Sequence, residues 1–129
     1  MIERQEYRVD ALAEPISHYT DAVRAGDLLF VSGFVPVDGD GRVVGGDDVV
    51  AQTRQVFANI GRVLAAAGTT FDQVVKVTVY LTEIGDRARI NPVRQEIFGD
   101  SRPASTLVEV SALVVPGAKV EIDAVALLS

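Results

Sequence analysis

The sequence predicts an α+β fold in which one mixed sheet carries two helices on a single face. Two segments place apolar side chains at helical spacing, and several other runs alternate or are rich in β-branched residues. The segments follow the order strands, helix, strand, helix, strands, which favours helices gathered on one side of a sheet. The chain has 129 residues, and no repeat or change of composition divides it, so we expect one domain over residues 1–129.

The first half of the chain supplies three strand candidates and the longer helix. The strand candidates are residues 4–9, 19–24 and 28–32. Residues 47–67 carry apolar side chains at spacings of three and four, which predicts a helix with one buried face. Asp47 and Asp48 suit the positive end of this helix, and Gly68 suits its C-terminal stop.

The second half supplies a shorter helix within residues 85–98 and three further strands. Proline is tolerated best in a first turn, so Pro92 leads us to expect the regular helix to begin near Ile90. The inward side chains are expected at positions 88, 90 or 91, 93, 97 and 98. The strands are residues 74–81, 105–110 and 119–128.

Both faces of the predicted sheet carry apolar side chains. The alternation in residues 74–81 places Val75, Val77, Val79 and Leu81 on one side of the sheet. The opposite face keeps Val74, Thr78, Tyr80, Val125 and Leu127. Two helices can cover only one face, so self-association is the expected way to cover the other. Scattered surface hydrophobic residues are the alternative.

Composition excludes several classes of function. There is no cysteine, which removes disulfides, thiolate metal sites and a cysteine nucleophile. The net charge of -6 argues against nucleic-acid binding, which normally needs a basic face. His18 is the single histidine, and no carboxylate spacing supports a metal site. No segment is apolar enough for a membrane span or a signal peptide, so we expect a cytoplasmic protein that does not bind membranes.

Four stretches of the chain, in order, carry a resemblance to a known family. They are His18 to Val23, Leu29 to Pro36, Ala51 to Leu81, and Arg102 to Val110 together with Val120 to Ala124. The set resembles the Rid/YjgF family, also labelled L-PSP endoribonuclease-like, and covers nearly the whole chain. The resemblance implies a single RidA-like domain with a chorismate-mutase-like (YjgF/L-PSP) fold, assembled as a homotrimer with clefts between subunits. In active members such a cleft hydrolyses imines and enamines such as 2-aminoacrylate, without a metal or an organic cofactor.

The resemblance also implies roles for single residues. Glu121 matches the glutamate that positions the attacking water, and Tyr19 matches a tyrosine at the mouth of the cleft. The substrate-binding positions are Ser32, Gly33, Phe34, Asn91, Ser105 and Thr106. Alternation puts Glu121 on the face assigned to the trimer, where burial would raise its pKa. Structural alternatives stand beside these roles, such as an ion pair between Glu121 and Lys119.

One departure from the family decides the expected function. The family binds the substrate carboxylate with an arginine in Pro-Ala-Arg-Ser or Thr, whereas this chain has Pro103, Ala104, Ser105 and Thr106. A serine brings no charge, a loss of about 2–4 kcal/mol in binding. Arg102 is the obvious substitute, but the odd spacing directs it to the opposite face of an extended strand, where a surface or inter-subunit ion pair is the alternative role. A bend at Pro103 could re-aim it toward the cleft. We therefore expect a cleft without fixed positive charge and weak or no activity on 2-aminoacrylate.

Two further substitutions alter the expected cleft. Phe34 stands where the family commonly has glutamine, which makes that wall more apolar. His18 stands where the family usually has proline, and beside Tyr19 it could shuttle protons near neutral pH. A solvated loop histidine is the alternative for His18.

The sequence therefore supports three hypotheses for function. The first is a hydrolase acting on an imine, an enamine or a related unstable metabolite, with a substrate that is neutral or anchored away from position 105. The second is a trimer that binds a small ligand without turnover. The third is a ribonuclease or translation inhibitor, which the acidic charge and the lack of an evident acid–base pair make the weakest.

Overall fold

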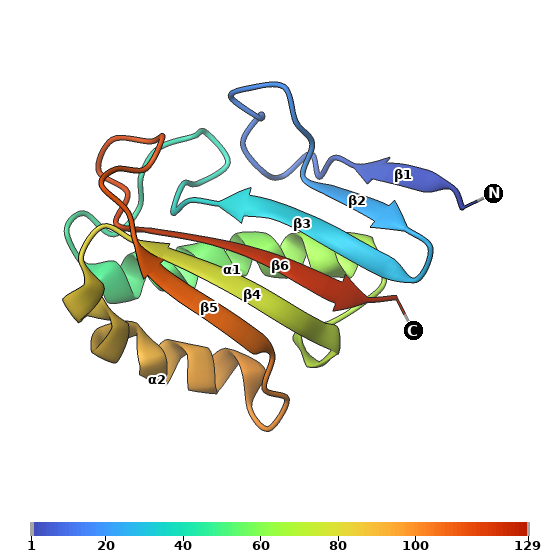
Figure 1. Cartoon of the computed structure of the whole chain (residues 1–129). Helices are drawn as coiled ribbons and strands as arrows, with labels where there is room; N and C mark the ends of the chain where they lie inside the picture. The colour runs from blue at the N-terminus through green and yellow to red at the C-terminus, as the bar shows by residue number, and fades with distance from the viewer. Residues whose placement is uncertain (1, 129) are drawn as a thin grey trace.

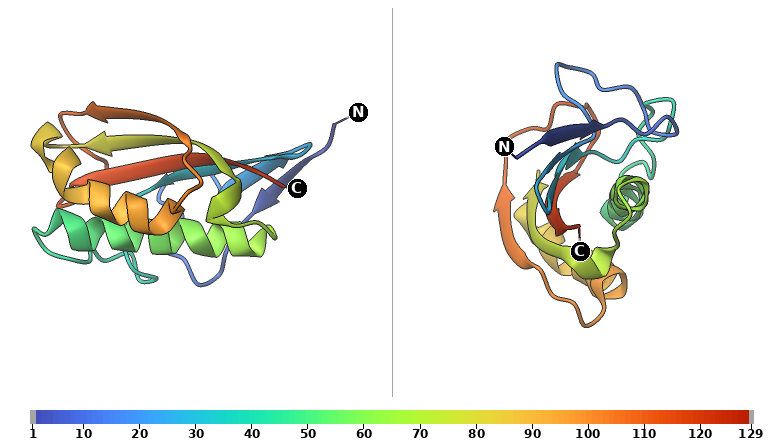
Figure 2. Two further views of the ribbon diagram at one scale, coloured as in Figure 1. Left: turned by 90° about the horizontal axis from the view of Figure 1, so that it is seen from below. Right: turned by 90° about the vertical axis from the view of Figure 1, so that its right-hand side faces the viewer.

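Figure 1 shows the computed structural model, which describes residues 2–128. Its strands are β1 (Arg4–Tyr7), β2 (Ala22–Ala25), β3 (Leu28–Phe34), β4 (Val74–Leu81), β5 (Ala104–Glu109) and β6 (Val120–Leu127). Its helices are α1 (Val49–Ala66) and α2 (Arg87–Phe98), and the short turns η1 (Phe71–Gln73) and η2 (Ile84–Asp86) precede β4 and α2. The strands form one sheet in the order β1-β2-β3-β6-β4-β5. Only β4 and β5 run parallel, and both helices pack on the same face (Figure 2). The predicted α+β architecture is confirmed.

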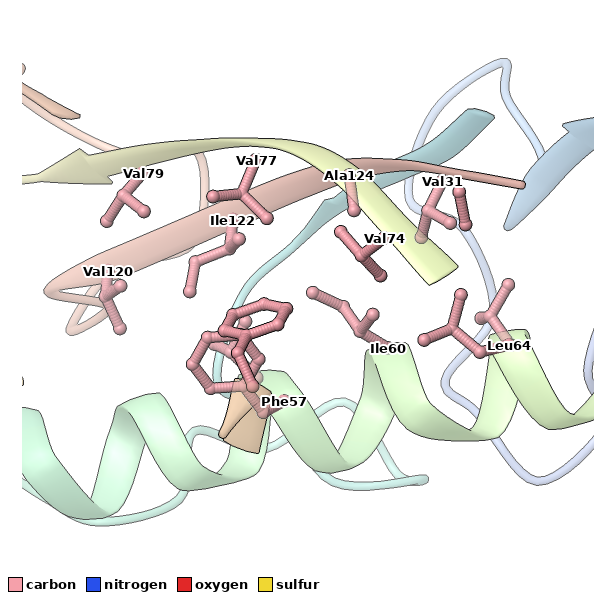
Figure 3. Close-up of a cluster of buried hydrophobic side chains, with 14 of the residues drawn as sticks. Val31, Phe57, Ile60, Leu64, Val74, Val77, Val79, Val120, Ile122 and Ala124 are labelled. Carbon is pink, nitrogen blue, oxygen red and sulfur yellow. The ribbon is translucent and has the colours of Figure 1, made fainter. Parts of the chain in front are cut away.

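The long helix forms where the apolar spacing predicts it. Asp48 caps its N-terminus, because the carboxylate accepts hydrogen bonds from the backbone N–H groups of Val50 and Ala51. Gly68 follows the helix with a positive φ of 80°, a conformation in which glycine carries no steric penalty. Figure 3 shows Phe57, Ile60 and Leu64 on the side of α1 that meets the sheet. This contact forms the centre of the core.

The start of α2 differs from the prediction. The helix begins at Arg87, before Ile90, and Pro92 lies inside it. Proline removes one backbone donor there, but Ile90, Val93 and Phe98 are all buried. Burying them contributes more than the lost hydrogen bond costs. The expected inward position at residue 88 is wrong, because that side chain is exposed.

The sheet has a buried face against the helices and an open face without any covering element among residues 2–128. A register shift between Val74 and Lys76 breaks the alternation at the start of β4. Val74 is therefore buried against the helices, whereas Val75 is 40% exposed, which reverses the predicted placement of both. The open face still carries exposed apolar side chains at Phe30 and Leu127, as its mixed character predicts. Within the described chain, neither helix has the length and apolar character needed to cross a bilayer.

Candidate functional site

The first group of predicted site residues lies where β3 and β6 run side by side. This β3–β6 cluster consists of Tyr19, Ser32, Gly33 and Glu121, which line one hollow on the open face of the sheet. The Ser32 hydroxyl donates a hydrogen bond of 2.6 Å to the backbone carbonyl of Thr20. Its oxygen can still accept a hydrogen bond from a ligand. Tyr19 is 48% exposed, so its ring is available to cover a bound molecule.

Gly33 and Glu121 approach each other closely in this cluster. A side chain at position 33 would overlap the carboxylate of Glu121, so only glycine leaves the carboxylate in place. Glu121 is half-buried and belongs to no ion pair among the described residues, so the structure does not contain the alternative contact with Lys119. Burial, and then the nearby charge of Asp123, raises the pKa of Glu121 above its ordinary value. The predicted direction of this shift is confirmed.

An apolar recess continues from the β3–β6 cluster beneath the end of β3. It shares Tyr19, Gly33 and Glu121 with the cluster, and its volume is about 100 Å³. Phe34 lines this recess and also packs against the core. The expected apolar wall at position 34 is therefore present, but inside the recess rather than in the hollow that Ser32 faces.

The second group of predicted site residues lies between α2 and β5. This α2–β5 cluster consists of Asn91, Arg94, Arg102 and Ser105, which line a hollow of about 610 Å³. Nη2 of Arg94 donates a hydrogen bond of 2.8 Å to the hydroxyl oxygen of Ser105. Desolvation lowers the pKa of Arg94 from its ordinary value. Within the described chain, the hollow beside Ser105 therefore contains a guanidinium that the expectation of a cleft without fixed positive charge did not include.

Arg102 also departs from the sequence-based expectation. The prediction placed it on the face opposite Ser105 because strand side chains alternate. The strand begins only at Ala104, so alternation does not govern residue 102, and Arg102 lines the same hollow as Ser105. Arg94 and Arg102 therefore both line the hollow beside Ser105, and the guanidinium of Arg94 contacts the Ser105 hydroxyl.

Two residues singled out from the sequence, Thr106 and His18, lie outside the α2–β5 cluster, and so does Glu109 of the fourth matching stretch. The hydroxyl oxygen of Thr106 accepts a hydrogen bond of 3.0 Å from Nζ of Lys76, and Thr106 pairs with Thr78 in the sheet. Thr106 thus belongs to the open face, opposite Ser105. His18 borders a shallow hollow beside Tyr19 and Ser32, close to the β3–β6 cluster. The carboxylate of Glu109 instead accepts a hydrogen bond from the backbone of Ile84.

The two clusters cannot meet within one copy of the chain. Strand register connects Val31 to Ala124, Ala124 to Val77, and Val77 to Ser105. Ser105 therefore lies three strand spacings from β3, about 14 Å across the sheet. The side chains of Val31, Val77 and Ala124 are buried on the helix face, so Ser105 points to that face too. The β3–β6 cluster opens on the other face, and Figure 1 shows β6 and β4 lying between β3 and β5.

Arg94 is the residue that the sequence reasoning missed. Its only sequence signal is its position three residues after Asn91, which puts both on one side of a helix. Because the predicted helix and the predicted strand were separate elements, nothing in the sequence placed Arg94 beside Ser105. Among residues 2–128, no group of three or more His, Cys, Asp or Glu side chains is arranged to hold a metal ion.

Comparisons with known proteins agree with the fold and with the four sequence stretches. The family model described as "Endoribonuclease L-PSP" matches residues 10–128. A RutC family protein from Pyrococcus horikoshii is 46% identical over 114 residues, covering 88% of this chain and 89% of that protein. The 2-iminobutanoate/2-iminopropanoate deaminase of Capra hircus is 39% identical over 112 residues, covering 86% and 80%.

Solved structures extend the likeness to the whole fold. The conserved Rid protein family member YyfA from Yersinia pestis superposes with a TM-score of 0.91 at 36% identity. The match covers 97% of this chain and 99% of that one. An identity of this size, over nearly the full length, goes beyond a shared fold alone.

Proposed function

The chain belongs to the Endoribonuclease L-PSP family, which includes Rid and RutC proteins, and on this basis we propose that it is a homotrimeric hydrolase of small imines or enamines. The observation that carries the proposal is the division of the site. The β3–β6 cluster and the α2–β5 cluster lie on opposite faces of one sheet, and β3 lies about 14 Å across the sheet from β5. A second copy must supply one of them if they are to act on one substrate.

The open face of the sheet is the surface proposed to bind the neighbouring copies. Phe30 is 46% exposed there, and Leu127 is 38% exposed. The two side chains lie on adjacent strands, because Phe30 pairs with Val125 and Leu28 pairs with Leu127. Covering this face would remove apolar surface from water and bring the β3–β6 cluster against another subunit.

The chemistry proposed for the cleft is addition of water to a C=N bond. An enamine that takes a proton on carbon becomes an iminium ion, and an imine becomes the same ion by taking a proton on nitrogen, which makes the carbon of the C=N bond electrophilic. Ionised Glu121 accepts a proton from water as the oxygen attacks that carbon. Proton transfer to nitrogen and cleavage of the C–N bond then release ammonia and leave a carbonyl. Tyr19 covers the substrate, and Ser32 accepts a hydrogen bond from it.

This proposal is tested by mass and by turnover. We expect a particle three times the 13.8 kDa of the chain by light scattering, and a monomer would contradict the assembled cleft. We also expect ammonia release from freshly generated 2-aminoacrylate or 2-iminobutanoate above the rate without protein. Glu121→Gln should lower that rate by roughly 100-fold, because it removes the base. Turnover that does not depend on Glu121 would exclude the assigned role.

Two other functions predict different outcomes in the same experiments. A trimer that only binds a ligand would show saturable binding of small metabolites but no ammonia release above background. A ribonuclease would degrade RNA during incubation with pure protein, and the net charge of -6 disfavours that reading.

A further inference from the structure

The hollow of the α2–β5 cluster carries positive charge without a carboxylate beside it. Arg94 and Arg102 both line it, and none of its lining side chains is acidic. Arg94 takes part in no ion pair within the described part of the chain. No acidic side chain that lines the hollow therefore balances the positive charge of these two arginines.

The guanidinium of Arg94 is held in place rather than free in solvent. The side chain is partly buried, and Ser105 accepts a hydrogen bond from Nη2 at 2.8 Å. Asn91 lies about one turn earlier on the same helix and lines the same hollow. A partly desolvated charge with no counterion gains free energy when an anion binds beside it. Holding the guanidinium in one orientation lowers the entropy lost on binding.

We propose that Arg94 anchors a carboxylate group of the substrate and that Ser105 orients its guanidinium. This assignment rests on the proposed hydrolase and names the residue of this chain that would hold the substrate carboxylate in place of an arginine at position 105. A guanidinium has five N–H donors in a planar fork, so the bond to Ser105 leaves donors for two-point binding of a carboxylate. The anchoring charge then comes from a helix, whereas the family takes it from the strand at position 105.

This inference reverses one expectation drawn from the sequence. Weak activity on 2-aminoacrylate was predicted because Ser105 carries no charge. With Arg94 in contact with Ser105, the position has a cation, and anionic substrates are expected to be accepted. A preference for neutral substrates is no longer expected.

Calorimetric titration with one acid and its neutral analogue tests the anchor. The probes are 2-oxobutanoate, the keto acid that hydrolysis of 2-iminobutanoate yields, and 2-oxobutanamide, which lacks the charge. We expect Arg94→Gln to raise the Kd for the acid by roughly 10- to 100-fold, the loss of a charge-assisted pair. The Kd for the amide should change by less than about threefold. Arg87→Gln is the matched control, because Arg87 is exposed on the same helix and outside the hollow.

A charge restored from another position provides a second test. Ser105→Arg in the Arg94→Gln background should recover most of the acid affinity, since it returns a guanidinium to the same hollow. Arg94→Lys keeps the charge but loses the planar fork, so it should retain part of the affinity. Both variants guard against a misleading loss of folding in Arg94→Gln.

Several results would overturn the assignment. It fails if the wild-type protein does not bind the acid, or if Arg94→Gln weakens binding no more than Arg87→Gln. It also fails if the acid and the amide lose affinity equally, because the role would then be structural rather than electrostatic. If the proposed hydrolase function is wrong instead, the acid would still bind through Arg94, but no imine would be consumed. If Arg94→Gln hydrolyses an anionic imine as fast as the wild type, the hydrolase function is supported and the role of Arg94 as the anchor is refuted.

Discussion

Mixing two inactive variants tests whether one cleft takes its residues from two subunits. Glu121→Gln disables the β3–β6 cluster, and Arg94→Gln disables the α2–β5 cluster. Both residues are at least partly exposed in the isolated chain, so neither change should prevent folding. If every cleft joins Glu121 of one copy to Arg94 of the next, mixed assemblies contain some clefts in which both are intact. If each copy held a complete site, no cleft would be intact.

The expected recovery follows from counting clefts. In an equimolar mixture, half of the Glu121 positions and half of the Arg94 positions are intact, and the two halves of a cleft come from different copies. About one quarter of the clefts therefore carry both intact residues when assembly is random. A mixed ring of three, whichever variant supplies two copies, holds one intact cleft. The mixture should reach about one quarter of the wild-type rate.

The assay compares ammonia release by the mixture with that of each variant treated identically. The two variants are unfolded together in denaturant and refolded, and wild-type protein passed through the same cycle sets the full rate. Each variant refolded alone sets the background. A mixture that is no faster than the average of its two parents would refute the shared cleft, provided light scattering shows that the assemblies have formed.

Three further predictions concern the close packing, charge and capping of single residues. Gly33→Ala should push the Glu121 carboxylate out of place, lowering ammonia release at least tenfold with little loss of stability, because the displaced group is the end of a flexible, half-buried side chain. Gly85→Ala, with open space around position 85, is the control and should change neither result. Because the folded-state pKa of Glu121 is raised above the ordinary 4.5, its ionisation lowers stability above that pH. Glu121→Gln should then melt higher than wild type at pH 7, with the difference disappearing below about pH 4; an unchanged difference across pH would contradict this. Asp48→Ala should cost about 1 kcal/mol in urea unfolding, since it removes the helix cap, whereas an equal loss in Asp47→Ala would argue against capping.

The sequence predicts most of the fold because periodicity reports burial directly. Helix α1 and strands β4 and β6 appear close to their expected limits, since long apolar patterns have few alternative explanations. The mispredicted positions are those at which tertiary packing overrides a preference of the local sequence. Pro92 leads to the expectation that the helix starts near Ile90, but the helix starts at Arg87, so Pro92 lies inside it rather than in its first turn. The bulge in β4 reversed the placement of Val74, and no periodic pattern signals a single inserted residue.

The candidate site was predictable on one side only. The face and the pKa shift of Glu121 follow from alternation along β6, a property of a single strand. The contact between Arg94 and Ser105 joins a helix to an edge strand, and it depends on how α2 packs beside β5. Spacing along the chain cannot give that arrangement, which is why the only cations considered from the sequence were near position 105 itself.

The contact between Arg94 and Ser105 also bears on why position 105 is small and neutral here. An arginine at both positions would bring two guanidinium groups together in one hollow that holds no acidic side chain. At about 4 Å, such a pair repels by roughly 1 kcal/mol in water and about 4 kcal/mol near a protein surface. Ser105→Arg in the wild-type background should therefore lower the unfolding midpoint and fail to tighten the binding of 2-oxobutanoate.

The same substitution has the opposite outcome if the hollow simply lacks an anchor. Ser105→Arg alone would then raise the affinity for the acid and the rate on 2-aminoacrylate, as a restored family arginine should. The sign of the change distinguishes the two accounts without any structure of a complex. A gain in the Arg94→Gln background with none in the wild type is the pattern expected when Arg94 already supplies the guanidinium at position 105.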